Sequence, residues 1–165
     1  MKRIILILLM ALLVTPALAA PQADVVDHPS CKYCGMDRDK FAHSRMLIEY
    51  DDGSRVATCS LHCTAVDLAN NLNRAPVSIQ VADYFSHDLL DAQTAVWVVG
   101  GNRPGVMSAR GKWAFADKAQ AEKFVAEAGG SIETFENAIK AAYEDMYRDT
   151  LMIREKRKAM MMKKP

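Results

Sequence analysis

The chain has 165 residues, half of them hydrophobic, and a formal net charge of +1. Once a targeting segment is set aside, this length is typical of one domain. The near balance of 21 basic and 20 acidic residues gives no indication of the strongly basic face that nucleic-acid binding requires.

The first residues have the pattern of a secretory signal peptide, residues 1–19. Lys2 and Arg3 precede the apolar run IILILLMALLV, and a small-x-small cleavage site ends at Ala19. The run is too short to span a bilayer comfortably, so we expect cleavage near Ala19. The mature chain is then expected to be exported, which for a bacterial protein means the periplasm, without stable membrane insertion. No Cys directly follows the run, which disfavours a lipid-modified N-terminus.

A linker and then a first strand-turn-strand-helix unit are predicted next. Residues 20–30 contain Pro and Asp without periodicity and are predicted to be the linker. Residues 43–50 and 55–58 read as the two strands of a hairpin around a turn at Gly53. Ser60 is a candidate N-cap for a helix. The apolar positions of that helix follow at helical spacing: Leu61, Ala65, Leu68 and Leu72.

A second unit of the same kind is predicted downstream, so that residues 31–130 form the main domain. Its strands are expected at 77–81, 95–99 and 112–115. Asp117 is a candidate cap for a helix that Gly129 and Gly130 end. Because the order strand, strand, helix recurs, we predict an α+β fold of duplicated ββα units, with helices on small antiparallel sheets.

The remaining segment, 131–165, is predicted to be a long helix from about Glu133. Apolar residues that step by three or four positions mark its buried face: Ile132, Phe135, Ile139, Tyr143, Met146, Thr150 and Ile153. The sequence then becomes REKRKAMMMKKP, which is basic and rich in Met. A solvated helix end is the expected interpretation of this tail. The alternative is an arm that docks a partner or collects copper.

Four cysteines have the spacing of a shared metal site. Cys31-x2-Cys34 is followed, after 24 residues, by Cys59-x3-Cys63. The first pair precedes the predicted hairpin, Cys59 ends it, and Cys63 lies one turn into the helix, which is a treble-clef-like arrangement. Four thiolates at this spacing suit tetrahedral Zn²⁺, and soft sulfur ligands also suit Cu(I). In an oxidising compartment the same cysteines would also allow two disulfides.

Two neighbouring residues bear on the choice of metal. Met36 follows Cys34 by two positions, and thioethers are poor zinc ligands but good Cu(I) ligands. The other interpretation of Met36 is hydrophobic filler. His62, inside the second cysteine pair, is either an auxiliary ligand or a solvent-facing residue.

With Cys34-Gly35-Met36 in place, the chain resembles the NosL family, exported copper-binding accessory proteins of nitrous oxide reductase maturation. Further matches are Asp83-Tyr84-Phe85, the strand AVWVV and the run GVMSARGKWAFADKAQAEKFVAEAGG. The resemblance implies a pair of ββα units. It also implies Cu(I) held by Cys34, Met36 and Met107.

The chain departs from the family pattern at its cysteines. It lacks the lipid-accepting Cys of many members and adds Cys31, Cys59 and Cys63. The segment CSLHC resembles heavy-metal knuckles of the YHS and TRASH type. These extra cysteines either enlarge a copper site or form a zinc knuckle beside it.

Three hypotheses from different classes follow. The first is a non-enzymatic Cu(I) metallochaperone that serves a periplasmic enzyme such as nitrous oxide reductase, or a membrane assembly complex. The second is an interaction module with a structural zinc site made of the four cysteines. The third is a thiol-disulfide protein, which the turn context of Cys31 and Cys34 disfavours because redox pairs of this spacing sit at a helix N-terminus.

Overall fold

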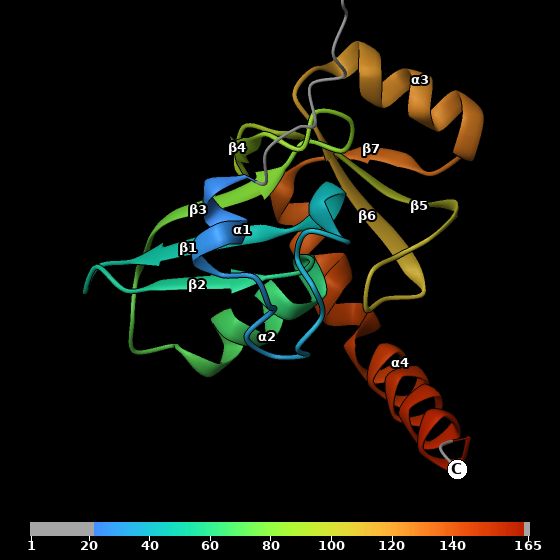
Figure 1. The fold of residues 1–165 in the computed structure, drawn as a ribbon. Helices are drawn as coiled ribbons and strands as arrows, with labels where there is room; N and C mark the ends of the chain where they lie inside the picture. Colours follow the sequence, from blue (N-terminus) through green and yellow to red (C-terminus); the bar gives the residue numbers. More distant parts are fainter. Residues whose placement is uncertain (1–21, 164–165) are drawn as a thin grey trace, which may run out of the picture.

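Two small antiparallel sheets form the frame of the protein (Figure 1). The computed structural model describes residues 22–163, so the predicted signal peptide and its cleavage site lie outside the described residues. The first sheet has the order β2-β1-β3-β4, from Arg55–Thr58, Met46–Tyr50, Pro76–Ala82 and Leu89–Asp91. The second has the order β6-β5-β7, from Arg110–Phe115, Val96–Pro104 and Ser131–Glu133. The predicted α+β class is confirmed.

Helices lie before, between and after these strands. They are α1 (Ala23–Asp27), α2 (Leu61–Asn70), α3 (Lys118–Ala128) and α4 (Phe135–Met162), with a 3-10 turn at Ala42–Ser44. Asp117 caps α3 as predicted, because its carboxylate accepts a hydrogen bond of 2.9 Å from the Gln120 N–H. Among residues 22–163, none of these helices combines the length and apolarity that a membrane crossing requires.

The two sheets share one pattern of strand pairing. In each, the first strand of the unit lies between the second strand and a strand that follows the helix: β1 between β2 and β3, and β5 between β6 and β7. The strand predicted at 77–81 therefore belongs to the first sheet and does not open the second unit. Its register pairs Ile79 with Ile48, and both side chains lie on one face, where Ile48 is fully buried and Ile79 partly buried.

The core lies between the sheets, and α4 fills much of it. Phe135, Ala138 and Ala142 of α4 are buried against Trp97 of β5 and Met46 of β1. Small Ala side chains let this helix pack closely against its neighbours. β7 pairs with β5, and the first half of α4 is part of the same core as the two sheets.

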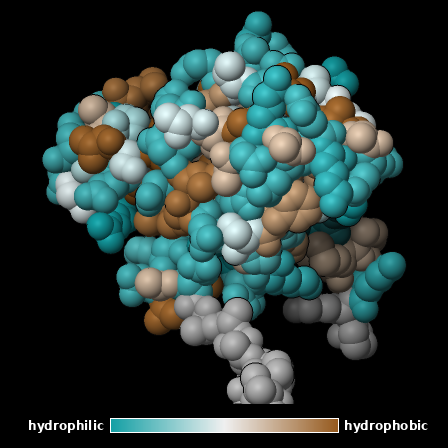
Figure 2. All heavy atoms as spheres, turned by 90° about the horizontal axis from the view of Figure 1, so that it is seen from above, coloured by the Kyte–Doolittle hydropathy of each residue, from teal (hydrophilic) through white to brown (hydrophobic). Residues whose placement is uncertain are grey.

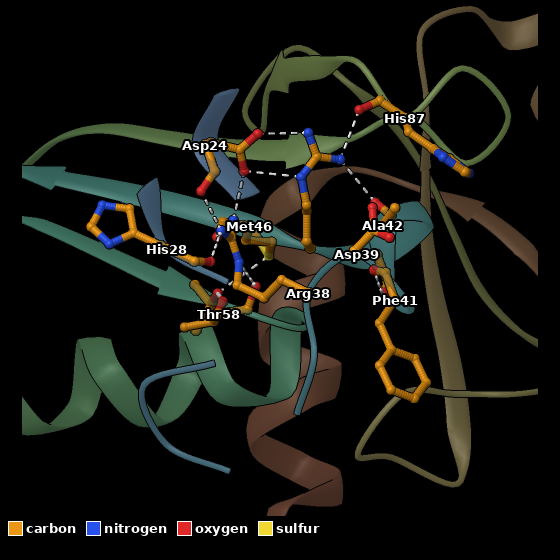
Figure 3. A network of polar contacts seen from close by, with 12 residues as sticks. Asp24, His28, Arg38, Asp39, Phe41, Ala42, Met46, Thr58 and His87 are labelled. Carbon is orange, nitrogen blue, oxygen red and sulfur yellow. Dashed lines mark hydrogen bonds and ion pairs between the residues drawn. The ribbon is translucent and has the colours of Figure 1, made fainter. Parts of the chain in front are cut away.

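The segment predicted as a linker also differs, because it contains α1 and a buried ion network (Figure 3). The Asp24 carboxylate accepts hydrogen bonds of 2.7 Å from Arg38 and of 2.8 and 2.9 Å from Arg45. Both arginine side chains are fully buried. Arg38 also donates to the Thr58 carbonyl, directly before Cys59, and Arg45 donates to the His87 carbonyl. The network therefore ties the N-terminal segment to the hairpin that carries the cysteines.

Seen from above, the surface is mainly hydrophilic (Figure 2). Hydrophobic residues gather there in a few separate groups. This distribution agrees with burial of most apolar side chains between the layers.

Candidate metal centre

The four cysteines converge on one point, as their spacing predicts. Their Sγ atoms all lie within 4.8 Å of one another, with Cys34 3.4 Å from Cys59 and Cys59 3.8 Å from Cys63. A tetrahedral site with Zn–S bonds of about 2.3 Å has sulfur atoms roughly 3.8 Å apart. The cluster therefore has the dimensions of a four-thiolate metal site.

Backbone hydrogen bonds build the turn that carries the first pair. Gly35 N–H donates to the Cys31 carbonyl at 2.9 Å, and Cys31 N–H donates to the Met36 carbonyl at 2.8 Å. Gly35 has a φ of 72°, which favours glycine at this position. Lys32 N–H donates to the Ala57 carbonyl and so docks the turn on β2, beside Cys59. The treble-clef-like arrangement is thus produced by local geometry.

Tyr33, which lies between the first two cysteines, is anchored to α2 by its side chain. The Tyr33 hydroxyl donates to the buried Asp67 carboxylate, which also accepts a hydrogen bond from Tyr50. Burial, together with the Asp67 charge, raises the pKa of Tyr33 to about 12. The phenol therefore stays protonated, and it can hold the turn in place as a hydrogen-bond donor.

Tyr33→Phe is expected to lower the free energy of unfolding by about 1–3 kcal/mol, because a buried carboxylate loses a donor. Lys32→Gln is the matched control: Lys32 lies 3.8 Å from the same carboxylate, but its side chain is half exposed. Loss of such an exposed pair should cost about 0–1 kcal/mol. Urea denaturation measures both variants, and equal losses would contradict the anchoring role of Tyr33.

Contacts among the four sulfur atoms make the thiols unequal. The hydrogen bond from Cys34 is the main cause of a lowered pKa at Cys31. At Cys34 the contact with Cys31 acts in the opposite sense, but Cys59 and Cys63 outweigh it, so its pKa is also lowered. The pKa values of Cys59 and Cys63 are raised, chiefly through Cys31, because further negative charges would crowd the cluster. A bound cation relieves this repulsion, so the cluster suits a metal ion.

A pocket of about 380 Å³ opens beside this cluster. Cys34, Met36 and Met107 all line it, so the structure brings the three residues of the copper hypothesis together from two distant parts of the chain. Cys34 is the one partly exposed cysteine, whereas Cys31, Cys59 and Cys63 are buried.

Met107 has an unusual backbone conformation. Its φ is 59°, in the left-handed region that non-glycine residues rarely adopt. Such a conformation costs roughly 1–3 kcal/mol and is often found at functional sites. This turn, between β5 and β6, places Met107 at the wall of the pocket.

Comparison with known proteins shows the family of this chain. Residues 22–143 match the family model described as NosL, and this match covers most of the chain. The chain belongs to the NosL family. A solved structure, the crystal structure of the copper chaperone NosL from Shewanella denitrificans, is similar in fold, with a TM-score of 0.54 and 20% sequence identity. The alignment covers 65% of this chain and 87% of that chain. No match was found among curated proteins.

The NosL match contains the whole candidate site. Cys34, Met36 and Met107 lie inside it, as do the other three cysteines. The match ends within α4, so the rest of that helix, residues 144–162, lies beyond it.

His62 differs from both interpretations that the sequence offered. Its side chain is buried rather than solvent-facing, and it is not part of the metal-ligand cluster found among residues 22–163. Its Nδ1 atom lies 3.4 Å from an Asp149 carboxylate oxygen on α4. Burial lowers the pKa of His62, although Asp149 opposes this shift. His62 therefore links the cysteine-bearing helix α2 to α4.

Proposed function

We propose that this NosL-family protein is an exported, non-enzymatic metallochaperone that carries one Cu(I) ion. One observation carries the proposal: Cys34, the partly exposed thiol of the cluster, lines a pocket together with the thioethers Met36 and Met107. The description of the similar Shewanella denitrificans protein as a copper chaperone supports it.

The ligand types fit a carrier. Cu(I) is a soft cation that prefers thiolate and thioether sulfur. The Cys34 thiolate would supply the strong, charged bond, and the neutral thioethers of Met36 and Met107 would supply weaker bonds that a partner's ligands can replace. Cu(I) stays in the same oxidation state throughout, so the chain needs to supply neither electrons nor a catalytic acid or base. Cys31, Cys59 and Cys63 would hold the turn and the hairpin in place from the buried side.

Met36→Leu and Met107→Leu are each expected to weaken Cu(I) binding by about tenfold, or 1.4 kcal/mol. Leucine keeps the apolar volume but has no sulfur. Met161→Leu is the control, because Met161 is exposed and does not line the pocket. The measurement is anaerobic competition for Cu(I) between the reduced protein and a chromophoric chelator. Equal affinities in all three variants would restrict Cu(I) to the thiols and contradict the role of the thioethers.

A structural zinc site is the second candidate, favoured by the sulfur separations of 3.4 to 3.8 Å among Cys34, Cys59 and Cys63. A closed site of four thiolates would contribute directly to folding. Complete zinc removal is then expected to unfold the protein and abolish its circular dichroism signal. Unchanged circular dichroism in the metal-free protein would contradict this candidate and leave the copper proposal standing.

The proposed recipient is a copper-receiving enzyme of the periplasm, such as nitrous oxide reductase, or the membrane complex that assembles it. Family membership supports this choice. The test is transfer of Cu(I) from the loaded protein to the metal-free enzyme in the presence of a chelator that captures released Cu(I). Activation of the enzyme despite the chelator would support direct delivery, whereas loss of all copper to the chelator would contradict it.

A further inference from the structure

The distal half of α4 forms one wall of the sulfur pocket. Five of its residues line the pocket with Cys34 and Met107: Met152, Ile153, Lys156, Arg157 and Met160. A spacing of four residues separates Met152, Lys156 and Met160, and also Ile153 and Arg157, so all five lie along one side of the helix. The wall thus adds two thioethers, Met152 and Met160, to the three sulfur residues already described.

One turn before Met152, α4 contacts the part of the fold that carries Met107 and the cysteines. Asp149, one turn earlier on α4, accepts a hydrogen bond of 2.9 Å from the Ala109 N–H and faces His62. Ala109 is two residues from Met107, and His62 is next to Cys63 in α2. Met152 therefore lies near the inner end of the pocket.

Met160 lies farther out on the same helix. Eight residues separate it from Met152, which corresponds to about 12 Å along the axis. Its side chain is 62% exposed, so burial in an apolar core does not explain its place at the pocket. In Figure 1 the last turns of α4 project away from the sheets, and Met160 belongs to them.

We propose that Met152 and Met160 are further Cu(I)-binding thioethers, which form an inner and an outer position at the entrance to the Cys34 site. This inference rests on the proposed function and concerns a segment beyond the NosL match. Lys156 and Arg157 lie between the two methionines and would attract the negative charge of the metal-free Cys34 thiolate.

The exchange step is simple in its chemistry. A bond from Cu(I) to the Met152 sulfur forms as the bond to Met36 or Met107 breaks, while the Cys34 thiolate stays bound. Both thioethers are neutral, so no proton moves and Cu(I) keeps its oxidation state. The ion then leaves Cys34 when the recipient's ligand replaces that thiolate.

The test is NMR of the reduced protein with ¹³C-labelled methionine methyl groups, assigned through Leu variants, during anaerobic addition of Cu(I). Signals of Met152 and Met160 are expected to shift along with those of Met36 and Met107, while the Met161 signal stays in place. Addition of Zn²⁺ is the control, because thioethers bind zinc poorly. It should leave the Met152 and Met160 signals unchanged.

The outcomes separate this inference from the function on which it rests. If the signals of Met36 and Met107 move and those of Met152 and Met160 do not, the α4 positions are contradicted and the carrier stands. If none of the four moves, the thioether site itself is wrong. A Met152→Leu/Met160→Leu double variant gives a second readout: we expect Cu(I) transfer to a chelator to slow several-fold, and an unchanged rate would overturn the inference.

Discussion

Cys34→Ser is expected to lower the affinity for Cu(I) by more than about a hundredfold while the protein stays folded. Even the loss of a group that only supports a metal ligand costs about 10–100-fold in metal affinity, and Cys34 would supply the charged bond itself. Cys34 is also the cysteine that belongs to both the thiol cluster and the pocket. Competition with a Cu(I) chelator measures the affinity, and circular dichroism checks the fold.

Cys31→Ser is the matched control for this prediction. Cys31 belongs to the same cluster but is buried and does not line the pocket. We expect this variant to lose stability and to keep most of its Cu(I) affinity. A folded Cys34→Ser variant with unchanged Cu(I) affinity would contradict the assignment. If both variants unfold and neither loses bound zinc in doing so, the cluster has a packing role.

Asp24→Asn is expected to lower the free energy of unfolding by about 3–5 kcal/mol, the range typical of breaking a buried ion pair. The carboxylate of Asp24 faces two fully buried arginines, Arg38 and Arg45, and its removal leaves both charges without their counterion. Asp27→Asn is the control, because Asp27 lies on the same short helix but is exposed. Chemical denaturation measures both, and a loss under about 1 kcal/mol in Asp24→Asn would contradict the account.

The Asp24 carboxylate also makes the free energy of unfolding depend on pH in the acid range. Burial would raise the pKa of Asp24, but hydrogen bonds and charges from Arg45 and Arg38 outweigh burial and lower it. Because the pKa of Asp24 is lowered in the folded state, its contribution to the free energy of unfolding is present above the unfolded-state pKa of about 3.9. This contribution is lost as the pH falls through the folded-state pKa. The gap in stability between the wild type and Asp24→Asn should therefore narrow below about pH 4.

The cysteine cluster is predictable from the sequence because the local spacing of the cysteines determines it. Cys31 and Cys34 share one turn, and Cys59 and Cys63 bracket the start of one helix, so each pair converges through local structure alone. The hairpin between the pairs then brings them together. The α+β class followed from periodicity in the same way.

Features that depend on distant contacts cannot be predicted from local sequence patterns. Asp24 gave no signal, because its two arginine partners lie 14 and 21 residues away and are brought to it by folding. The strands β4 and β7 have three residues each, too few to show a periodicity. His62 lies beside Asp149, which is far along the chain on α4. The pocket wall is likewise made by residues of α4 that are distant in sequence from Cys34.

The central claim is that Cu(I) binds thioethers as well as the Cys34 thiolate. The most direct test is copper-edge X-ray absorption of the reduced, Cu(I)-loaded protein in which selenomethionine replaces methionine. Thioether ligation predicts a copper–selenium contact in this protein and a copper–sulfur contact in its place when methionine is unlabelled. A copper environment made of thiolate sulfur alone, identical in both preparations, would contradict it.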